Sequence, residues 1–192
     1  MSEPLFPLFL RLAGRRVLLV GAGRVAAAKL PTLLASGAQV AVVAPEVRPE
    51  FEAAEVEIWR RPFEPWDVDG AWLVVAAAPP EVNRAVAQAA SAQRIFVNAV
   101  DDVASGSAYT GGVLRRGGLT IAVATEGRAP ALAGLVREGL EAVLPDEIEA
   151  WVDEARRLRE RQRLAGVPFD RRRPLLLEAL NRLYAARVEA TP

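Results

Sequence analysis

The chain has 192 residues, of which 52% are hydrophobic, so it can form a substantial domain with a packed core. It contains no cysteine and no histidine, which excludes disulfides, thiolate or imidazole metal ligands, and catalysis by an imidazole base. The 24 basic and 24 acidic residues cancel, which gives no case for a nucleic-acid partner. No apolar run approaches the ~20 residues that span a bilayer, and no signal-peptide pattern is recognised, so we expect a cytoplasmic protein without a membrane partner.

The first half of the chain predicts an alternation of strands and helices. The expected elements are a strand at 16–20, a glycine turn at 21–26, a helix to 35, strands at 39–43, 56–59 and 71–77, a helix at 81–92 and a strand at 94–98. The first three elements and the second strand complete a βαβ unit, whose right-handed crossover implies a parallel sheet. Continuously apolar strands are typical of a sheet that is covered on both faces.

The second half has a different pattern. Residues 111–112 suggest a turn, residues 119–125 have strand composition, and helices are expected from Pro130, from residue 147 and from Pro174. The segment 151–192 carries 10 basic against 6 acidic residues. The fold class that we predict is α/β, with a Rossmann-like parallel sheet over 1–110, a small α+β region over 111–145 and a helical region over 146–192.

The turn Gly21-x-Gly23-x-x-Ala26 has the spacing of a dinucleotide-binding loop. Gly21 permits the tight turn, Gly23 lets the backbone approach a pyrophosphate, and the helix that follows offers free N–H groups. Glu46 follows the second strand at the distance where an acid holds the adenine ribose, which favours NAD over NADP. A plain βα turn and a solvated loop glutamate are the alternatives, and the nearby Arg24 and Arg48 weaken the preference for NAD.

Two familiar classes of nicotinamide enzyme do not fit. A hydroxy-acid dehydrogenase needs a histidine, and a short-chain dehydrogenase needs Tyr-x-x-x-Lys, whereas Tyr109 is followed by Thr-Gly-Gly-Val. Asp101 and Asp102 follow the fifth predicted strand, at the edge where open α/β sheets bind ligands. A carboxylate there can orient a substrate or move a proton, although both residues can also cap a turn.

The chain resembles the precorrin-2 dehydrogenase family, the amino-terminal module of siroheme synthase, over nearly its whole length. The segments that carry the resemblance occur in the family's order at 4–9, 20–26, Lys29, 43–46, 62–63, Asn83, 96–101, 116–117 and 125–133. Departures from the family pattern lie at 78–80, at Ala108 and Gly111, and at 124–130. They affect the expected substrate pocket and any metal-insertion role, and leave the glycine turn and Asp101 untouched.

The resemblance implies an NAD-dependent oxidation of precorrin-2 to sirohydrochlorin in siroheme biosynthesis, with Asp101 as general base. It implies an NAD-binding domain at 1–110, a homodimerisation region at 111–145 and a tetrapyrrole-binding region at 146–192. The residues expected to contact NAD are Gly21, Gly23, Arg24, Val25, Pro45 and Glu46. Carboxylates of the substrate need polar or cationic hosts, for which the candidates are Asn98, Arg116, Thr125 and Arg156. No resident metal is expected.

Two alternatives stay open. A bifunctional enzyme would also insert Fe²⁺ into sirohydrochlorin, although the chain lacks the histidine and cysteine that commonly bind such metals. A nucleotide-sensing module would bind NAD without catalysis, because a Rossmann fold does not fix a function.

Overall fold

The computed structural model describes residues 4–100, 102 and 104–190, with the side chains of 184–190 left out of the description. The chain divides into two compact units, 1–110 and 111–192, and each unit is described by itself.

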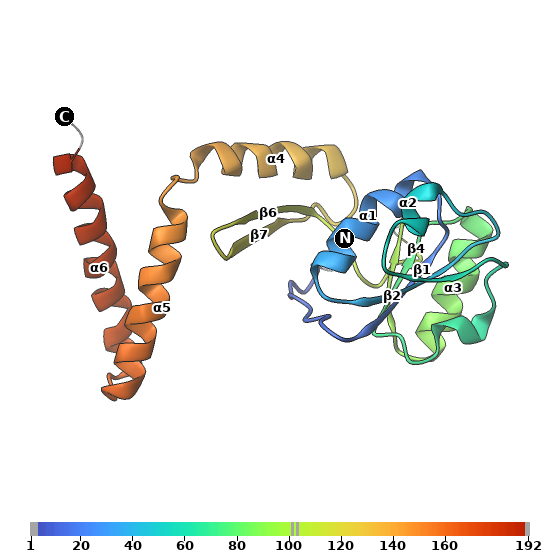
Figure 1. Ribbon diagram of the computed structural model, residues 1–192, viewed down its shortest axis with the longest axis horizontal. Helices are drawn as coiled ribbons and strands as arrows, with labels where there is room; N and C mark the ends of the chain where they lie inside the picture. The colour runs from blue at the N-terminus through green and yellow to red at the C-terminus, as the bar shows by residue number, and fades with distance from the viewer. Residues whose placement is uncertain (1–3, 101, 103, 191–192) are drawn as a thin grey trace. The chain divides into compact units, whose positions relative to one another are not determined.

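The first unit is built on a five-stranded parallel sheet with the order β3-β2-β1-β4-β5 (Figure 1). The strands are β1 (Arg16–Val20), β2 (Gln39–Val43), β3 (Glu57–Trp59), β4 (Leu73–Ala76) and β5 (Phe96–Ala99). The helices are α1 (Arg24–Ala35), α2 (Pro49–Glu52), the 3₁₀ turn η1 (Pro65–Val68) and α3 (Pro80–Ala92). This is the Rossmann-like sheet that the sequence predicts.

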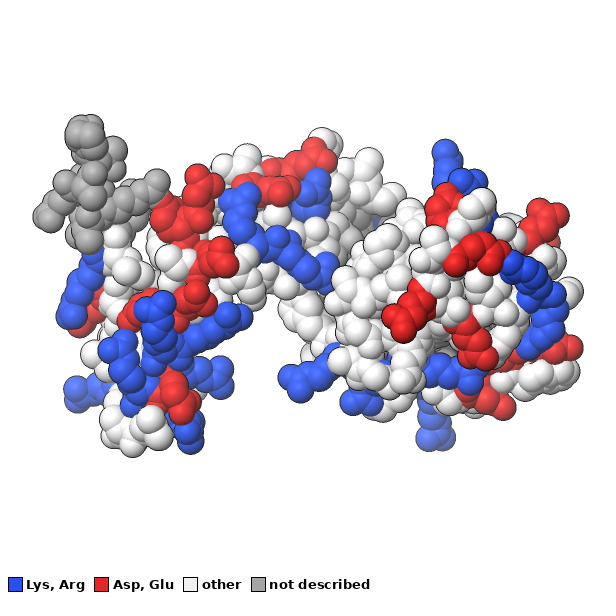
Figure 2. All heavy atoms as spheres, viewed as in Figure 1, with Lys and Arg blue, Asp and Glu red and all other residues white. Residues whose placement is uncertain are grey.

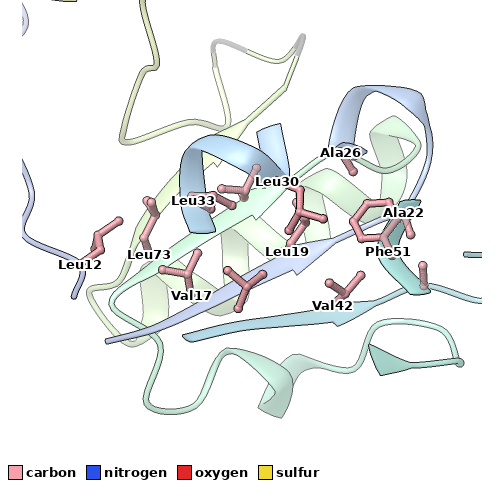
Figure 3. Close-up of a cluster of buried hydrophobic side chains, with 13 residues drawn as sticks. Leu12, Val17, Leu19, Ala22, Ala26, Leu30, Leu33, Val42, Phe51 and Leu73 are labelled. Atoms are coloured by element: carbon pink, nitrogen blue, oxygen red, sulfur yellow. The ribbon is translucent and has the colours of Figure 1, made fainter. Parts of the chain in front are cut away.

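Alternate side chains of each central strand enter two separate hydrophobic cores. Val17 and Leu19 of β1 pack with Leu30 and Leu33 of α1 and with Phe51 of α2 on one face (Figure 3). On the other face, the buried residues of β1 and β4 pack with α3 and η1; this core contains Leu18, Val20, Val74, Ala76, Val68, Val86 and Ala90. Residues 17–20 of β1 and all of β4 are apolar because both faces of the sheet are covered there.

The order of the strands places a crevice between β1 and β4. From β1 the chain moves to β2 and β3 on one side, and it returns to β4 and β5 on the other. The connections therefore leave the carboxyl ends of β1 and β4 in opposite directions. Open α/β sheets bind ligands at such a switch point.

The second unit consists of a hairpin and three helices. Its elements are β6 (Gly112–Arg116), β7 (Leu119–Val123), α4 (Pro130–Val143), α5 (Ile148–Leu164) and α6 (Phe169–Ala190). β6 and β7 pair antiparallel, and α4 packs closely on the hairpin, since a Cβ atom added at Gly112 would lie 2.8 Å from the carbonyl oxygen of Ala133. No helix among the described residues is long and apolar enough to cross a membrane.

Two expectations about the second half of the chain are wrong. Gly112 begins strand β6 instead of a turn, because its lack of a side chain serves the close approach of α4. The last helix begins at Phe169, and Pro174 lies inside it. Pro174 removes a single backbone hydrogen bond in the second turn, and Asp170 in the first turn favours the helix start through its charge.

Candidate functional site

The site is built around the turn that joins β1 to α1. The amide of Gly21 donates to the carbonyl of Val43 at 2.9 Å, and the amide of Ala77 donates to the carbonyl of Val20 at 2.8 Å. The strand ladders thus continue past the ends of β1, β2 and β4 and hold the turn in place. Gly23 is the N-cap of α1 and has no side chain to satisfy the first amides of the helix.

The two glycines of the turn have different surroundings. Gly21 has φ +94°, and a Cβ atom added there would lie 2.3 Å from the carbonyl oxygen of Ala77. Gly23 has φ −82°, and an added Cβ atom would meet nothing within 4 Å. The fold itself requires Gly21, whereas the absence of a side chain at Gly23 leaves open space beside the uncapped amides of a helix. That space fits the pyrophosphate of a dinucleotide.

A cavity of about 630 Å³ lies against this turn at the carboxyl ends of β1, β2 and β4. Its lining includes the predicted cofactor residues Gly21, Gly23, Pro45 and Glu46. Such a volume is in the range of small-molecule and cofactor sites. The structure therefore brings together four of the six residues expected to contact NAD.

Among the described residues, the charged side chains that line this cavity are both acidic, Glu46 and Glu81. Arg48 is engaged by a salt bridge to Glu50 at 2.8 Å, which raises the pKa of Arg48 and lowers that of Glu50 through their side-chain hydrogen bond. The two acidic side chains disfavour the 2′-phosphate of NADP, while the first amides of α1 can donate hydrogen bonds to the pyrophosphate.

A second cavity, of about 270 Å³, shares Ala77 and Ala78 with the first. Val25, at the start of α1, lines this smaller cavity together with Asn83, Val100 and Asp102. Val25 is thus the fifth cofactor candidate at the crevice, and Arg24 is exposed and lines neither cavity. The two cavities together reach from the end of β2 to the chain that follows β5.

The Asp102 side chain caps a turn, as its residue type allows. Its carboxylate accepts the hydroxyl of Ser105 at 2.7 Å and the amide of Ser105 at 3.2 Å. The side-chain hydrogen bond from Ser105 is the main cause that holds the pKa of Asp102 below its usual range. Asp101, the predicted general base, lies outside the described residues.

Asn98 is a buried residue of β5 and lines neither cavity. Its Nδ2 donates to the carbonyl of Ala108 at 2.9 Å. This contact joins β5 to the segment that returns along it, where Val97 also donates its amide to the hydroxyl of Ser107. The observed contact of Asn98 is structural.

The other substrate candidates belong to the second unit. Arg116 donates to the carbonyl of Leu144 at 3.1 Å, and the hydroxyl of Thr125 accepts the amide of Ala129 at the start of α4. Arg156 pairs with Asp153 at 3.3 Å, and its guanidinium lies over the hairpin turn, 2.5 Å from where a Cβ of Gly118 would be. Basic side chains gather around α5, interspersed with acidic ones (Figure 2).

Sequence reasoning assigned no role to the wall that α3 contributes. Val82 and Ala85 of α3 line the larger cavity, as do Pro62 and Phe63 before η1. The spacing of Val82 and Ala85, three residues apart in the helix after β4, is the signal that could have found them. Among the described residues, no group of three or more Asp, Glu, His or Cys side chains is arranged to hold a metal ion.

The sheet order, the glycine turn and the cavity define a Rossmann-type dinucleotide-binding protein. A family model described as putative NAD(P)-binding matches residues 8–112, and a model described as sirohaem biosynthesis protein central matches residues 116–142. The chain therefore belongs to the family of the amino-terminal, NAD(P)-binding module of siroheme synthase.

Relatives with known names support this membership. Siroheme synthase 3 of Aeromonas hydrophila is 42% identical over 172 residues, which cover 87% of this chain and 37% of that protein. The siroheme synthase of Photorhabdus laumondii is 38% identical over 184 residues, which cover 93% of this chain and 39% of that protein. The chain thus spans less than two fifths of the length of these relatives.

A solved structure titled SirC, precorrin-2 dehydrogenase, has a TM-score of 0.72 and 26% sequence identity with this chain. The match covers 91% of this chain and 88% of that one, so both units have counterparts in a single protein. NAD is the cofactor that the family and the site indicate.

Proposed function

We propose that this protein oxidises precorrin-2 to sirohydrochlorin with NAD⁺ in siroheme biosynthesis. The observation that carries the proposal is the pair of cavities at the switch point, one against the glycine turn and one against Val100, which share Ala77 and Ala78. One cavity has the features of a cofactor site, and the other adjoins the chain segment that leads to Asp101. The name of the SirC structure and the names of the siroheme synthases support the choice of substrate.

The cofactor would be held by the residues that line the larger cavity. The first amides of α1, freed by Gly23, would receive the pyrophosphate, and Glu46 would receive the adenine ribose. When bound, NAD⁺ supplies a hydride acceptor. Glu46 and Glu81 favour NAD⁺ over NADP⁺ because each would repel a 2′-phosphate.

The substrate gives up a hydride and a proton, so precorrin-2 and NAD⁺ become sirohydrochlorin, NADH and H⁺. In the proposed reaction Asp101 accepts that proton as general base. Its support is its place in the chain, directly after Val100 at the carboxyl end of β5, and the match of residues 96–101 to the family pattern.

Further parts of the proposal concern the second unit. Arg116, Thr125 and Arg156 are proposed to bind substrate carboxylates, in keeping with the basic composition of 151–192. A homodimer formed through 111–145 is supported by the exposed apolar side chains of α4, which are Leu132, Leu135, Val136 and Val143. A cytoplasmic location stays a prediction.

The proposal is tested by anaerobic incubation of the purified protein with precorrin-2 and either NAD⁺ or NADP⁺, while the absorbance of NADH and of sirohydrochlorin is followed. We expect both products to appear together and faster with NAD⁺. Folded protein that binds NAD⁺ and forms no NADH would contradict the proposal and favour a sensing module. Addition of Fe²⁺ after oxidation shows whether sirohydrochlorin is consumed faster than in a protein-free control.

A further inference from the structure

Asn83 is a buried polar side chain in the wall of the smaller cavity. It lies in the first turns of α3 and is 3% exposed. Its Oδ1 accepts the amide of Ala78 at 3.0 Å, and its Nδ2 lies 3.4 Å from the carbonyl oxygen of Val100, to which it donates. One side chain therefore joins the chain that leaves β4 to the chain that leaves β5.

The two partners define the orientation of the amide group. Ala78 offers a donor and Val100 offers an acceptor, so Oδ1 must face Ala78 and Nδ2 must face Val100. An aspartate could accept from Ala78 but would place a second oxygen against the carbonyl of Val100. An apolar side chain would satisfy neither group, which explains why an asparagine suits this position.

Val100 is held from two directions. Its amide donates to the carbonyl of Ala76 at 2.9 Å, and its carbonyl accepts from Asn83. Ala78, Asn83 and Val100 all line the smaller cavity, and Asn83 is not part of the lining of the larger one. Val100 lines only the smaller cavity, whereas Ala78 lines both, so loss of the Asn83 contacts would act mainly on the wall of the smaller cavity.

We propose that Asn83 is a positioning residue for the oxidation, which sets Val100 and Ala78 at the substrate end of the crevice. This inference rests on the proposed function, in which Asp101 follows Val100 as the general base. A proton acceptor needs a defined place relative to its substrate, because small displacements reduce the rate by orders of magnitude. The contribution of Asn83 is therefore expected in turnover more than in cofactor binding.

The test compares Asn83→Asp and Asn83→Ala with the wild type in steady-state oxidation of precorrin-2, NAD⁺ titration and thermal unfolding. The aspartate keeps the acceptor and loses the donor, and the alanine leaves room for water. We expect kcat to fall at least tenfold in both variants, with the Kd for NAD⁺ within about twofold of the wild-type value and a smaller change in KM for precorrin-2. A matched control is Gln93→Ala, which removes a hydrogen bond to Asp69 at the other end of α3 and is expected to leave kcat unchanged.

Wild-type kcat in either folded variant would overturn the positioning role and leave the proposed function standing. Equal losses in kcat and in NAD⁺ affinity, or failure of both variants to fold, would assign Asn83 to general stability and also overturn it. An inactive wild type would instead contradict the proposed function itself, so the two failures are distinguishable.

Discussion

The turn between β1 and α1 contains two glycines that answer to different requirements. At Gly21 the backbone has a positive φ and lies against the carbonyl of Ala77, so the fold tolerates no side chain there. At Gly23 the backbone is ordinary and the space is open. The sequence motif predicts these two roles, a tight turn at Gly21 and a pyrophosphate approach at Gly23, and the surroundings of the two glycines agree with them.

Substitutions at the two glycines are therefore expected to affect different properties, stability at Gly21 and NAD⁺ binding at Gly23. Gly21→Ala is expected to destabilise the protein by about 3 kcal/mol, from backbone strain and the contact with Ala77. Gly23→Ser is expected to keep the stability within about 1 kcal/mol, since serine caps helices well, and to weaken NAD⁺ binding at least tenfold. Urea unfolding and NAD⁺ titration measure the two effects. Wild-type NAD⁺ affinity in Gly23→Ser would mean that the cofactor binds elsewhere.

Among the elements, η1 is attached to the chain segment that follows β3 by a buried charge. The carboxylate of Asp67 is 1% exposed and pairs with both terminal nitrogens of Arg61, at 2.5 and 2.9 Å. Burial of the carboxyl group raises its pKa, but the hydrogen bonds from Arg61 and from the amide of Glu64, with the charges of Arg61 and Arg16, outweigh burial. The pKa of Asp67 therefore lies below its ordinary value of 3.8.

This shift predicts a pH dependence of stability. Because the pKa is lower in the folded protein than in the unfolded chain, the stabilisation is present above pH 3.8 and is lost as the pH falls through the folded pKa. Asp67→Asn is expected to lower the free energy of unfolding by about 2 kcal/mol at neutral pH. This is less than the cost of breaking a fully buried ion pair, because Arg61 is 36% exposed. Urea unfolding at pH values from 7 to 3 measures the free energy of unfolding of the wild type and of the variant. If this free energy fell as steeply below pH 4 in the variant as in the wild type, the account would be contradicted.

Local signals predicted the first βαβ unit well, because strand, glycine turn and helix follow one another within 43 residues. They failed for β6, where Gly112 looks like a turn residue until the approach of α4 is known. They failed also for the start of α6, where Pro174 was read as a boundary. The spacing of Val82 and Ala85 shows that α3 has one apolar face, but that this face lines the cavity depends on tertiary packing.

At the scale of the whole molecule, the second unit presents an apolar helix face. Leu132, Leu135 and Val136 of α4 have helical spacing and are exposed within the single chain, with Leu135 at 66%. If this face forms the proposed homodimer, Leu135→Glu is expected to yield folded monomers in sedimentation equilibrium. Trp66→Glu, at an equally exposed position of η1, serves as the control and should remain dimeric. A monomeric wild type would contradict the assembly.

The measurement that tests the central claim most directly is an anaerobic comparison of the wild type with Asp101→Asn, using precorrin-2 and NAD⁺. The account predicts one NADH for each sirohydrochlorin in the wild type, and a loss of at least a hundredfold in turnover with unchanged NAD⁺ affinity in the variant. Turnover of the variant at the wild-type rate would remove Asp101 from the mechanism. Absence of NADH from wild-type protein that binds NAD⁺ would contradict the assignment of the crevice as an oxidising site for precorrin-2.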